Sequence, residues 1–201
     1  MTRALALALA LAAACGGAAP VSLSDRWPAE SGDYRDVTAA WTRHAELTAG
    51  YQEALVVDAT FKSPEWRAAY VDRVAHLGRL SAAQRAELVA QQQKEAAEHY
   101  EVQLLVTTWD RRENDLHRGA KSVWKVVLVD DAGVTVEPAS IERDRRPENV
   151  LRADYPALGD FSQAYVARFP RRVELMKPGS RGFALRIWGA RGAVEMQWRG
   201  R

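Results

Sequence analysis

The C-terminal segment of the chain carries the pattern that most constrains its fold. Apolar side chains alternate with other residues on both sides of a turn at Gly189–Gly192. They are Phe183, Leu185 and Ile187 before the turn, and Val194, Met196 and Trp198 after it. A period of two places these side chains on one face of two paired strands. The segment therefore predicts an antiparallel β-hairpin with one buried face.

Similar patterns recur upstream and predict further antiparallel strands. In residues 100–107, every second side chain is apolar and the others are polar except Leu105. Residues 123–137 contain a β-branched run interrupted by the turn sequence Asp130–Gly133. Residues 161–169 place aromatic side chains on one face of a strand that ends at a proline. The charged residues 142–160, which include two prolines, predict a long loop.

The region before these strands leaves two structures open. Residues 37–48 alternate in a way that fits the first strand of a hairpin, with residues 51–61 as the second strand and Ala49–Gly50 as the turn. The same residues 37–48 also fit a helix. The sequence alone does not decide between strand and helix here.

A helical hairpin is predicted between the strands, at about residues 64–98. Ser63–Glu65 combines a capping hydroxyl, a proline at the first helical position and a carboxylate in the first turn. Gly78 is a typical helix stop. Ser81 with Gln84 three residues later is the pattern of a capping box that starts a second helix.

The fold class that follows is mainly β with a helical insertion (α+β). Seven or eight short strands in hairpins predict an antiparallel β-sandwich, with the helical hairpin inserted at about 64–98. This arrangement looks like an immunoglobulin-like sandwich without the disulfide between its sheets. A half-open barrel of the kind found in lipoprotein carriers is the alternative.

Packing must stabilise this domain without covalent help. The chain has one cysteine, so no internal disulfide can form. Seven tryptophans supply large apolar area instead. They are Trp27, Trp41, Trp66, Trp109, Trp124, Trp188 and Trp198. We expect them in the core and at its edges, and a tryptophan-lined ligand groove is the alternative.

The N-terminus carries an export pattern. Arg3 precedes an apolar run, Ala4–Ala14, which is too short to span a bilayer, and the single cysteine, Cys15, follows three alanines. This pattern resembles the lipobox signal of bacterial envelope lipoproteins, although the leucine usual at the third position before the cysteine stands one place earlier, at Leu11. The resemblance implies removal of a signal peptide, residues 1–14, and lipidation of Cys15. Residues 15–36, rich in small residues and proline, then predict a flexible tether to a domain at 37–201.

The expected location is the cell envelope, anchored to a membrane through the lipid on Cys15. Gly16 rather than aspartate after the cysteine favours, by resemblance, the outer membrane facing the periplasm where the envelope has two membranes. Residues 141–201 hold thirteen Lys and Arg against seven Asp and Glu. This excess of basic residues fits a surface that binds anionic lipid or glycan. Alternatively, the acidic first half of the chain neutralises it in the folded domain. An exported chain with a total formal charge of +2 makes nucleic acid an unexpected partner.

One polar cluster is a candidate metal site. Asp110, Glu113, Asp115 and His117 lie close together in the sequence and could hold a divalent cation. Three neighbouring arginines make salt bridges to the carboxylates the simpler interpretation. We therefore expect no metal and no other cofactor, because phosphate-binding and metal-ligand motifs are also missing from the sequence.

Function is constrained only at a general level. The first hypothesis is a non-enzymatic interaction or structural module that engages an envelope protein or glycan. The second is a carrier or sensor of a small apolar or lipidic ligand held inside the fold. The third is a hydrolase of envelope polymers, which would need carboxylates that converge in a cleft. No catalytic residue is assigned, and the oligomeric state is not predicted.

Overall fold

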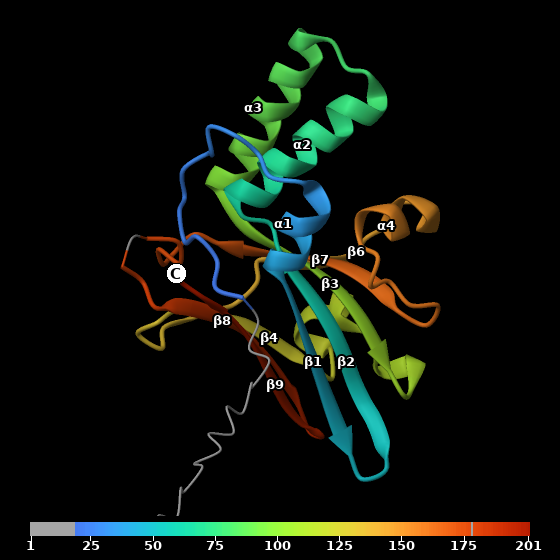
Figure 1. The fold of residues 1–201 in the computed structure, drawn as a ribbon. Helices are drawn as coiled ribbons and strands as arrows, with labels where there is room; N and C mark the ends of the chain where they lie inside the picture. Colours follow the sequence, from blue (N-terminus) through green and yellow to red (C-terminus); the bar gives the residue numbers. More distant parts are fainter. Residues whose placement is uncertain (1–18, 178) are drawn as a thin grey trace, which may run out of the picture.

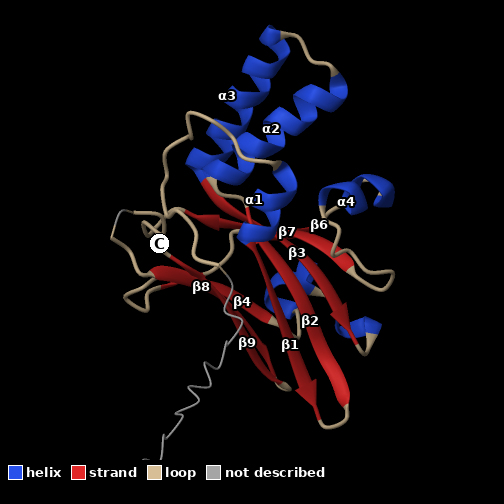
Figure 2. Ribbon diagram, in the orientation of Figure 1, coloured by secondary structure: helices blue, strands red, loops and turns tan. Residues whose placement is uncertain are grey.

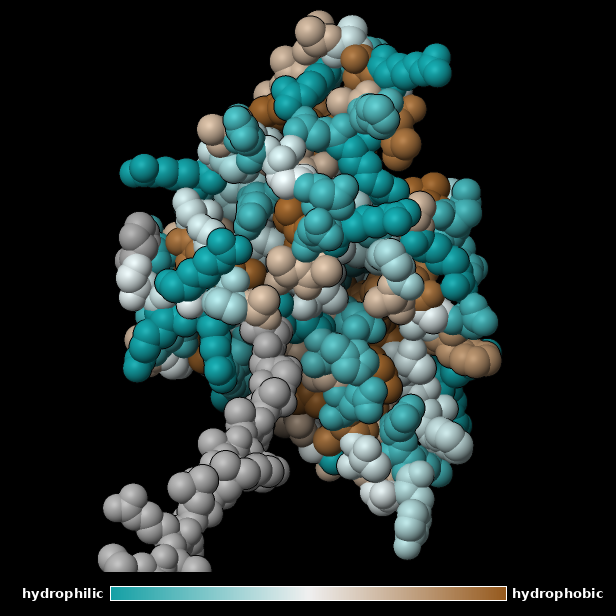
Figure 3. Space-filling model, in the orientation of Figure 1, coloured by the Kyte–Doolittle hydropathy of each residue, from teal (hydrophilic) through white to brown (hydrophobic). Residues whose placement is uncertain are grey.

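Two antiparallel sheets packed face to face form the body of the protein. The computed structural model describes residues 19–177 and 179–201. Helices cover parts of the sandwich, and two of them project from it as a helical hairpin (Figure 1, Figure 2). In the space-filling view, hydrophilic side chains are spread over this face of the molecule (Figure 3). The α+β class with antiparallel sheets and an inserted helical hairpin is thus confirmed.

Strand order brings distant segments together. The larger sheet contains, from edge to edge, β1 (Thr42–Ala49), β2 (Gln52–Phe61), β3 (His99–Thr108), β7 (Gln163–Pro170) and β6 (Ser140–Arg143). The smaller sheet contains β5 (Thr135–Val136), β4 (Lys125–Val129), β8 (Gly182–Gly189) and β9 (Gly192–Arg199). The C-terminal hairpin β8–β9 forms in the expected register, with Trp188 opposite Ala193.

The helices begin and end where capping groups allow. They are α1 (Tyr34–Trp41), α2 (Pro64–Gly78), α3 (Ala82–Glu98) and α4 (Glu148–Asp154), with short 3-10 turns η1 (Arg111–Glu113) and η2 (Leu116–Lys121). The Ser63 hydroxyl accepts the N–H of Trp66, and Ser81 and Gln84 form the predicted capping box. Within the described residues, no helix has both the length and the apolar character needed to cross a membrane.

Aromatic side chains join the two sheets in the core. The ring of Phe61 on β2 lies 4.6 Å from that of Phe183 and 5.9 Å from that of Trp198, both on the smaller sheet. Trp41 also stacks on Phe61, at 5.8 Å. These residues are almost completely buried, as are Trp66 and Trp124. Core packing therefore accounts for four of the seven tryptophans, whereas Trp109 is 65% exposed and lies outside the core.

Arg43 closes one edge of the sandwich. It lies on β1, is only 5% exposed, and donates from Nε to the carbonyl of Gln197 on β9 at 2.7 Å. Its Nη1 donates to the carbonyls of Ala40 and Thr42, and its Nη2 to the carbonyl of Ala19. One guanidinium thus connects both sheets and the N-terminal segment.

Several expectations require correction. Residues 37–48 are neither wholly strand nor wholly helix, since α1 ends at Trp41 and β1 starts at Thr42. The predicted loop at 142–160 contains part of β6 and all of α4. These elements are short, and their charged side chains pair with one another. They therefore show no long periodic pattern of apolar residues. Phe161 precedes β7 and is 70% exposed rather than part of its buried face.

The segment expected as a tether over residues 15–36 is fixed to the domain in its described part. Val21 forms a parallel bridge to Gly200, and Val21 and Leu23 are buried. Tyr34 starts α1 and donates its hydroxyl to the carbonyl of Asp154 at 3.0 Å. The apolar residues that hold this segment are too few and too widely spaced to give a periodic signal. Cys15 and the expected signal peptide, residues 1–14, lie outside the described residues.

Candidate functional site

An apolar slot lies at the edge of the sandwich opposite Arg43. Its volume is about 330 Å³. Its walls come from η2, from β4, from the chain that crosses between the sheets, and from the end of β8. The lining residues are Leu116, Gly119, Ala120, Trp124, Lys125, Val126, Val127, Glu137, Pro138, Ala139, Ser140, Ile141 and Trp188. Ligand pockets in proteins generally measure about 300–1,000 Å³, so the slot suits a small molecule.

The slot exists because β5 is only two residues long. β5 pairs with Leu128 and Val129 of β4, and residues 125–127 have no partner strand on that side within the described chain. After β5 the chain leaves the smaller sheet through residues 137–139 and enters the larger sheet as β6. The two sheets are therefore bridged by a crossover here, and space remains between that crossover and β4.

Trp124 packs beside the slot and has an unusual buried polar atom. The residue is 3% exposed, and its backbone N–H is accepted by the Ser122 hydroxyl at 3.1 Å. Its indole Nε1 is buried and has no hydrogen-bond partner among the described residues. A buried N–H without an acceptor costs about 1–3 kcal/mol, so close packing of the indole must offset this cost.

Gly189 allows Trp124 to occupy its position. A Cβ atom at Gly189 would lie 2.8 Å from the carbonyl oxygen of Val123 and 3.0 Å from Cε3 of Trp124. Both distances are shorter than normal contacts, and the first atom belongs to the backbone and cannot move freely. A glycine at the end of β8 is therefore needed for the indole to pack at the slot.

Polar groups lie at the rim. The Lys125 ammonium donates to the carbonyl of Ala120 at 2.7 Å, and Glu137 is exposed. Trp188, on the neighbouring strand, is 37% exposed. An apolar interior with a few polar groups at its mouth is typical of sites for small apolar molecules.

The residues considered as metal ligands do not converge. Asp110 pairs with Arg112 at 2.7 Å, and Glu113 pairs with Arg191 at 2.8 Å. The bonds from Arg112 lower the pKa of Asp110 to about 2. No group of three His, Cys, Asp or Glu side chains in residues 19–177 and 179–201 is placed to hold a metal ion. Of the three neighbouring arginines, Arg112 pairs with Asp110 and Arg118 lies 3.6 Å from Asp115, whereas the partner of Glu113 comes from the β8–β9 turn.

Asp115 and His117 have structural contacts. One oxygen of Asp115 accepts the Ser122 hydroxyl at 2.7 Å and the N–H of Val123 at 3.2 Å. His117 stacks on Tyr165 with ring centroids 6.1 Å apart, and burial lowers its pKa. Asp115 thus fastens the loop that places Leu116 and Trp124 at the slot. Its role is positional, since it holds the loop through Ser122 and Val123.

The carboxylates whose pKa is shifted in the described part of the chain are all held in their charged form. Every carboxylate with a resolved shift there has a lowered pKa: Asp72, Glu101, Asp110, Asp131, Asp144 and Glu195. Burial alone would raise the pKa of Asp144, but hydrogen bonds from Arg146, at 2.7 Å, lower it. A general acid that cleaves glycosides needs a raised pKa.

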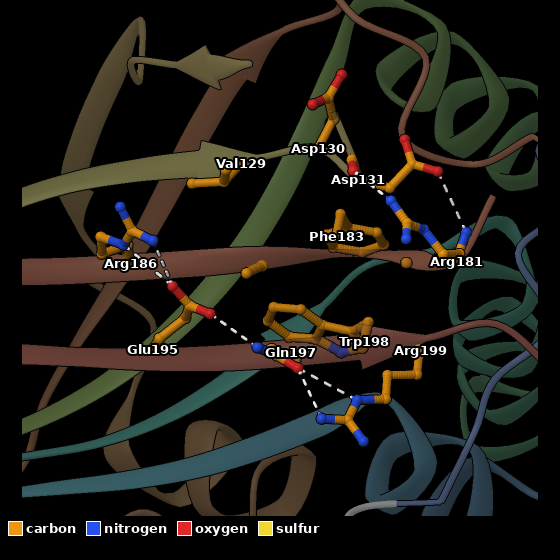
Figure 4. A pocket seen from close by; sticks show the side chains of 12 residues that line it. Val129, Asp130, Asp131, Arg181, Phe183, Arg186, Glu195, Gln197, Trp198 and Arg199 are labelled. Carbon is orange, nitrogen blue, oxygen red and sulfur yellow. Dashed lines mark hydrogen bonds and ion pairs between the residues drawn. The ribbon is translucent and has the colours of Figure 1, made fainter. Parts of the chain in front are cut away.

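A second hollow, of about 480 Å³, lies on the outer face of the smaller sheet (Figure 4). Its polar side chains bind one another in a row. Arg186 pairs with Glu195 at 2.7 Å, Gln197 donates to Glu195 at 2.8 Å, and Arg199 donates to Gln197 at 3.0 Å. Because these groups satisfy one another, this hollow is a weaker ligand site than the slot.

Known proteins give no assignment. No family model and no curated protein matches the chain. One solved structure, a novel protein of unknown function from Burkholderia pseudomallei, is similar over 77% of both chains, at 13% identity and a TM-score of 0.38. A similarity at this level supports no conclusion about fold or function.

The slot was not predicted as a site from the sequence. Trp124 and Trp188 stood among the tryptophans considered for a groove, but Leu116 and Ile141 come from segments that no local pattern connects. The slot forms because a very short strand is followed by a crossover to the other sheet. This arrangement depends on contacts between segments that are far apart in the sequence.

Proposed function

We propose that this chain is a lipid-anchored protein of the bacterial cell envelope that carries or senses a small apolar ligand in the slot. The main support is the slot itself, with its tryptophan, leucine and isoleucine walls. Its presence favours the ligand-binding hypothesis over an interaction or structural module without a ligand. The lowered pKa values of the carboxylates favour both over a hydrolase.

The ligand that suits the slot is small and mostly apolar. The apolar walls provide the hydrophobic gain, about 25 cal/mol per Å² of area removed from water. Lys125 and Glu137 at the rim would keep a polar end of the ligand in water.

Binding can be tested with the fluorescent probe N-phenyl-1-naphthylamine, which brightens in apolar sites. We expect the purified protein to bind it and the tryptophan fluorescence to be quenched, because Trp124 and Trp188 line the slot. Native mass spectrometry of the same sample should show a retained small molecule.

A matched pair of variants makes the test specific. Ala120→Phe places a ring at the slot, whereas Ala132→Phe places one in the exposed β4–β5 turn. Ala120→Phe should abolish probe binding, and Ala132→Phe should leave it unchanged. Equal binding by both variants, or no binding by the unmodified protein, would rule out the slot as the ligand site.

The anchor is part of the same proposal and has its own test. The pattern that ends at Cys15 supports lipidation, with the outer membrane facing the periplasm as the proposed location. Metabolic labelling with a fatty acid should mark the protein, and Cys15→Ser should remove the label. A labelled or membrane-bound Cys15→Ser protein would refute the anchor.

The immunoglobulin-like likeness expected from the sequence remains a proposal of the same kind. It is supported by the antiparallel sandwich and not by the strand order. Envelope protein, glycan and membrane remain the proposed classes of partner.

A further inference from the structure

The described chain begins beside the last strand. The N–H of Val21 donates to the carbonyl of Arg199 at 2.9 Å, and the N–H of Arg201 donates to the carbonyl of Val21 at 3.1 Å. The Arg201 side chain donates from Nε to the carbonyl of Pro20 at 3.3 Å. The point where the chain enters the domain is therefore fixed next to these two arginines.

Four basic side chains surround this entry point, and we call them the basic end. They are Lys177, Arg181, Arg199 and Arg201. Together with Ser22, Leu23, Gly179, Ser180 and Gly200 they line a hollow of about 540 Å³. All four are exposed, and none forms an ion pair with a carboxylate of the described residues.

Among the other arginines that have a close side-chain partner, most pair with a carboxylate. Arg146 bridges Asp144 and Asp154, and Arg186 pairs with Glu195. The basic end differs because four cations without a carboxylate partner in the described part of the chain line one hollow. Figure 4 shows Arg181 and Arg199 at the same end of the β8–β9 pair.

One acidic group lies beside the basic end. The Asp131 carboxylate accepts the N–H of Arg181 and the hydroxyl of Ser180, both at 3.2 Å. The bond from the backbone of Arg181 is the main cause of the lowered pKa of Asp131. This carboxylate is thus committed to the backbone of the 180–181 turn, and four cations outnumber it.

The chain length from Cys15 limits how far this surface can lie from a membrane. Five residues separate Cys15 from Val21, so the fully extended chain between them spans only about 20 Å. A domain of this size has a radius of gyration of about 16 Å. The surface around Val21 must therefore lie near the membrane that holds a lipid on Cys15.

We propose that the basic end binds the anionic phospholipid headgroups of that membrane. This inference rests on the lipidation in the proposed function. Charge complementarity selects the occupant, because clustered Lys and Arg beside a lipid anchor attract anionic lipid. The lipid and the basic end together give two points of attachment, which hold the domain in one orientation.

The test uses a chain that starts at Gly16, which keeps every buried residue of the described core. Sedimentation should show binding to vesicles of phosphatidylcholine mixed with phosphatidylglycerol, and none to phosphatidylcholine alone. Each basic residue near an anionic surface contributes about a fivefold gain in partitioning. Lys177→Gln with Arg199→Gln should therefore weaken binding about 30-fold.

The control removes the same charge elsewhere. Arg79, at the tip of the helical hairpin, and Arg145, after β6, are both exposed. Arg79→Gln with Arg145→Gln should leave binding unchanged. Equal losses in the two double variants, or equal binding to both kinds of vesicle, would overturn the proposal.

Failure of the anchor and failure of the basic end give different results. If the anchor is absent but the basic end binds lipid, the fatty-acid label is missing and the Gly16 chain still sediments with anionic vesicles. If the anchor is present but the basic end is inactive, the labelled protein is membrane-bound and the Gly16 chain does not sediment.

Discussion

Replacing Arg43 by glutamine tests how the closed edge of the sandwich is held. The Arg43 guanidinium donates to four backbone carbonyls, from Ala19, Ala40, Thr42 and Gln197. It also lies over the Trp198 ring, at 5.6 Å from the centroid. Glutamine is too short to reach the same set of acceptors, so we expect β1 to loosen from β9.

The expected loss can be estimated from these contacts. Hydrogen bonds from a charged donor contribute about 1.5–3 kcal/mol each, and burying the cation costs several kcal/mol. Burial also lowers the pKa of Arg43, which shows that the surroundings disfavour its charge. We therefore expect Arg43→Gln to reduce the free energy of unfolding by about 3–5 kcal/mol, against a typical total of about 5–15 kcal/mol.

Urea unfolding followed by circular dichroism measures this loss as a shift in midpoint. At a slope of about 2 kcal/mol per M, the midpoint should fall by roughly 2 M. Arg186→Gln is the control, because Arg186 is 48% exposed and its pair with Glu195 should contribute less than about 1 kcal/mol.

The result that refutes this reasoning is a similar midpoint for the two variants. If Arg43→Gln does not fold, Arg43→Lys provides the measurement. Lysine keeps the charge but loses the planar fork. The Arg43→Lys protein should therefore fold, with a urea midpoint below those of the unmodified protein and of Arg186→Gln.

Three further predictions follow from single contacts. Gly189→Ala should lower stability by about 1–3 kcal/mol and shift the emission of Trp124, because the new methyl group overlaps the strand and the indole; an unchanged melting temperature would contradict this. Asp144, whose pKa is lowered by Arg146 despite burial, should add stability that is present above its ordinary pKa of about 4 and lost as pH falls through its lower folded pKa. The difference in urea midpoint between the unmodified protein and Asp144→Asn should therefore shrink below about pH 4, and a constant difference would refute the linkage. Ser81→Ala should cost about 1 kcal/mol and speed hydrogen exchange in the first turn of α3, because the capping box is lost, and unchanged exchange there would show that the box is dispensable.

Elements with strong local signals could be predicted from the sequence. The helical hairpin followed from the Ser63 cap and the Ser81–Gln84 box, and β8–β9 followed from alternation around Gly189–Gly192. In each case the deciding interactions lie within a few residues of one another. Local alternation and capping patterns were therefore enough to predict these elements.

α1 was only partly predictable. Its N-terminus is capped by Asp33, which accepts the N–H groups of Arg35 and Asp36. This cap was a usable signal, but the helix has only eight residues and runs directly into β1. Because this helix and this strand follow each other without a break, the spacing of their apolar residues does not show where one ends and the other begins.

The slot depends on contacts that no local pattern contains. Leu116, Ile141 and Trp188 meet only because β6 joins the larger sheet while β4 and β8 lie in the smaller one. The sequence shows that the cluster near Asp115 is polar. It does not show that Asp115 fastens a loop, because that role depends on where the Ser122 hydroxyl lies in the fold.

The short β5 strand also bears on how the protein avoids self-association. An unpaired strand edge at residues 125–127 is a template on which another chain could add a strand. Lys125 places a charge on that edge, and Pro138 in the adjoining crossover has no N–H to offer a ladder. The same residues that leave space beside β4 thereby discourage aggregation through it.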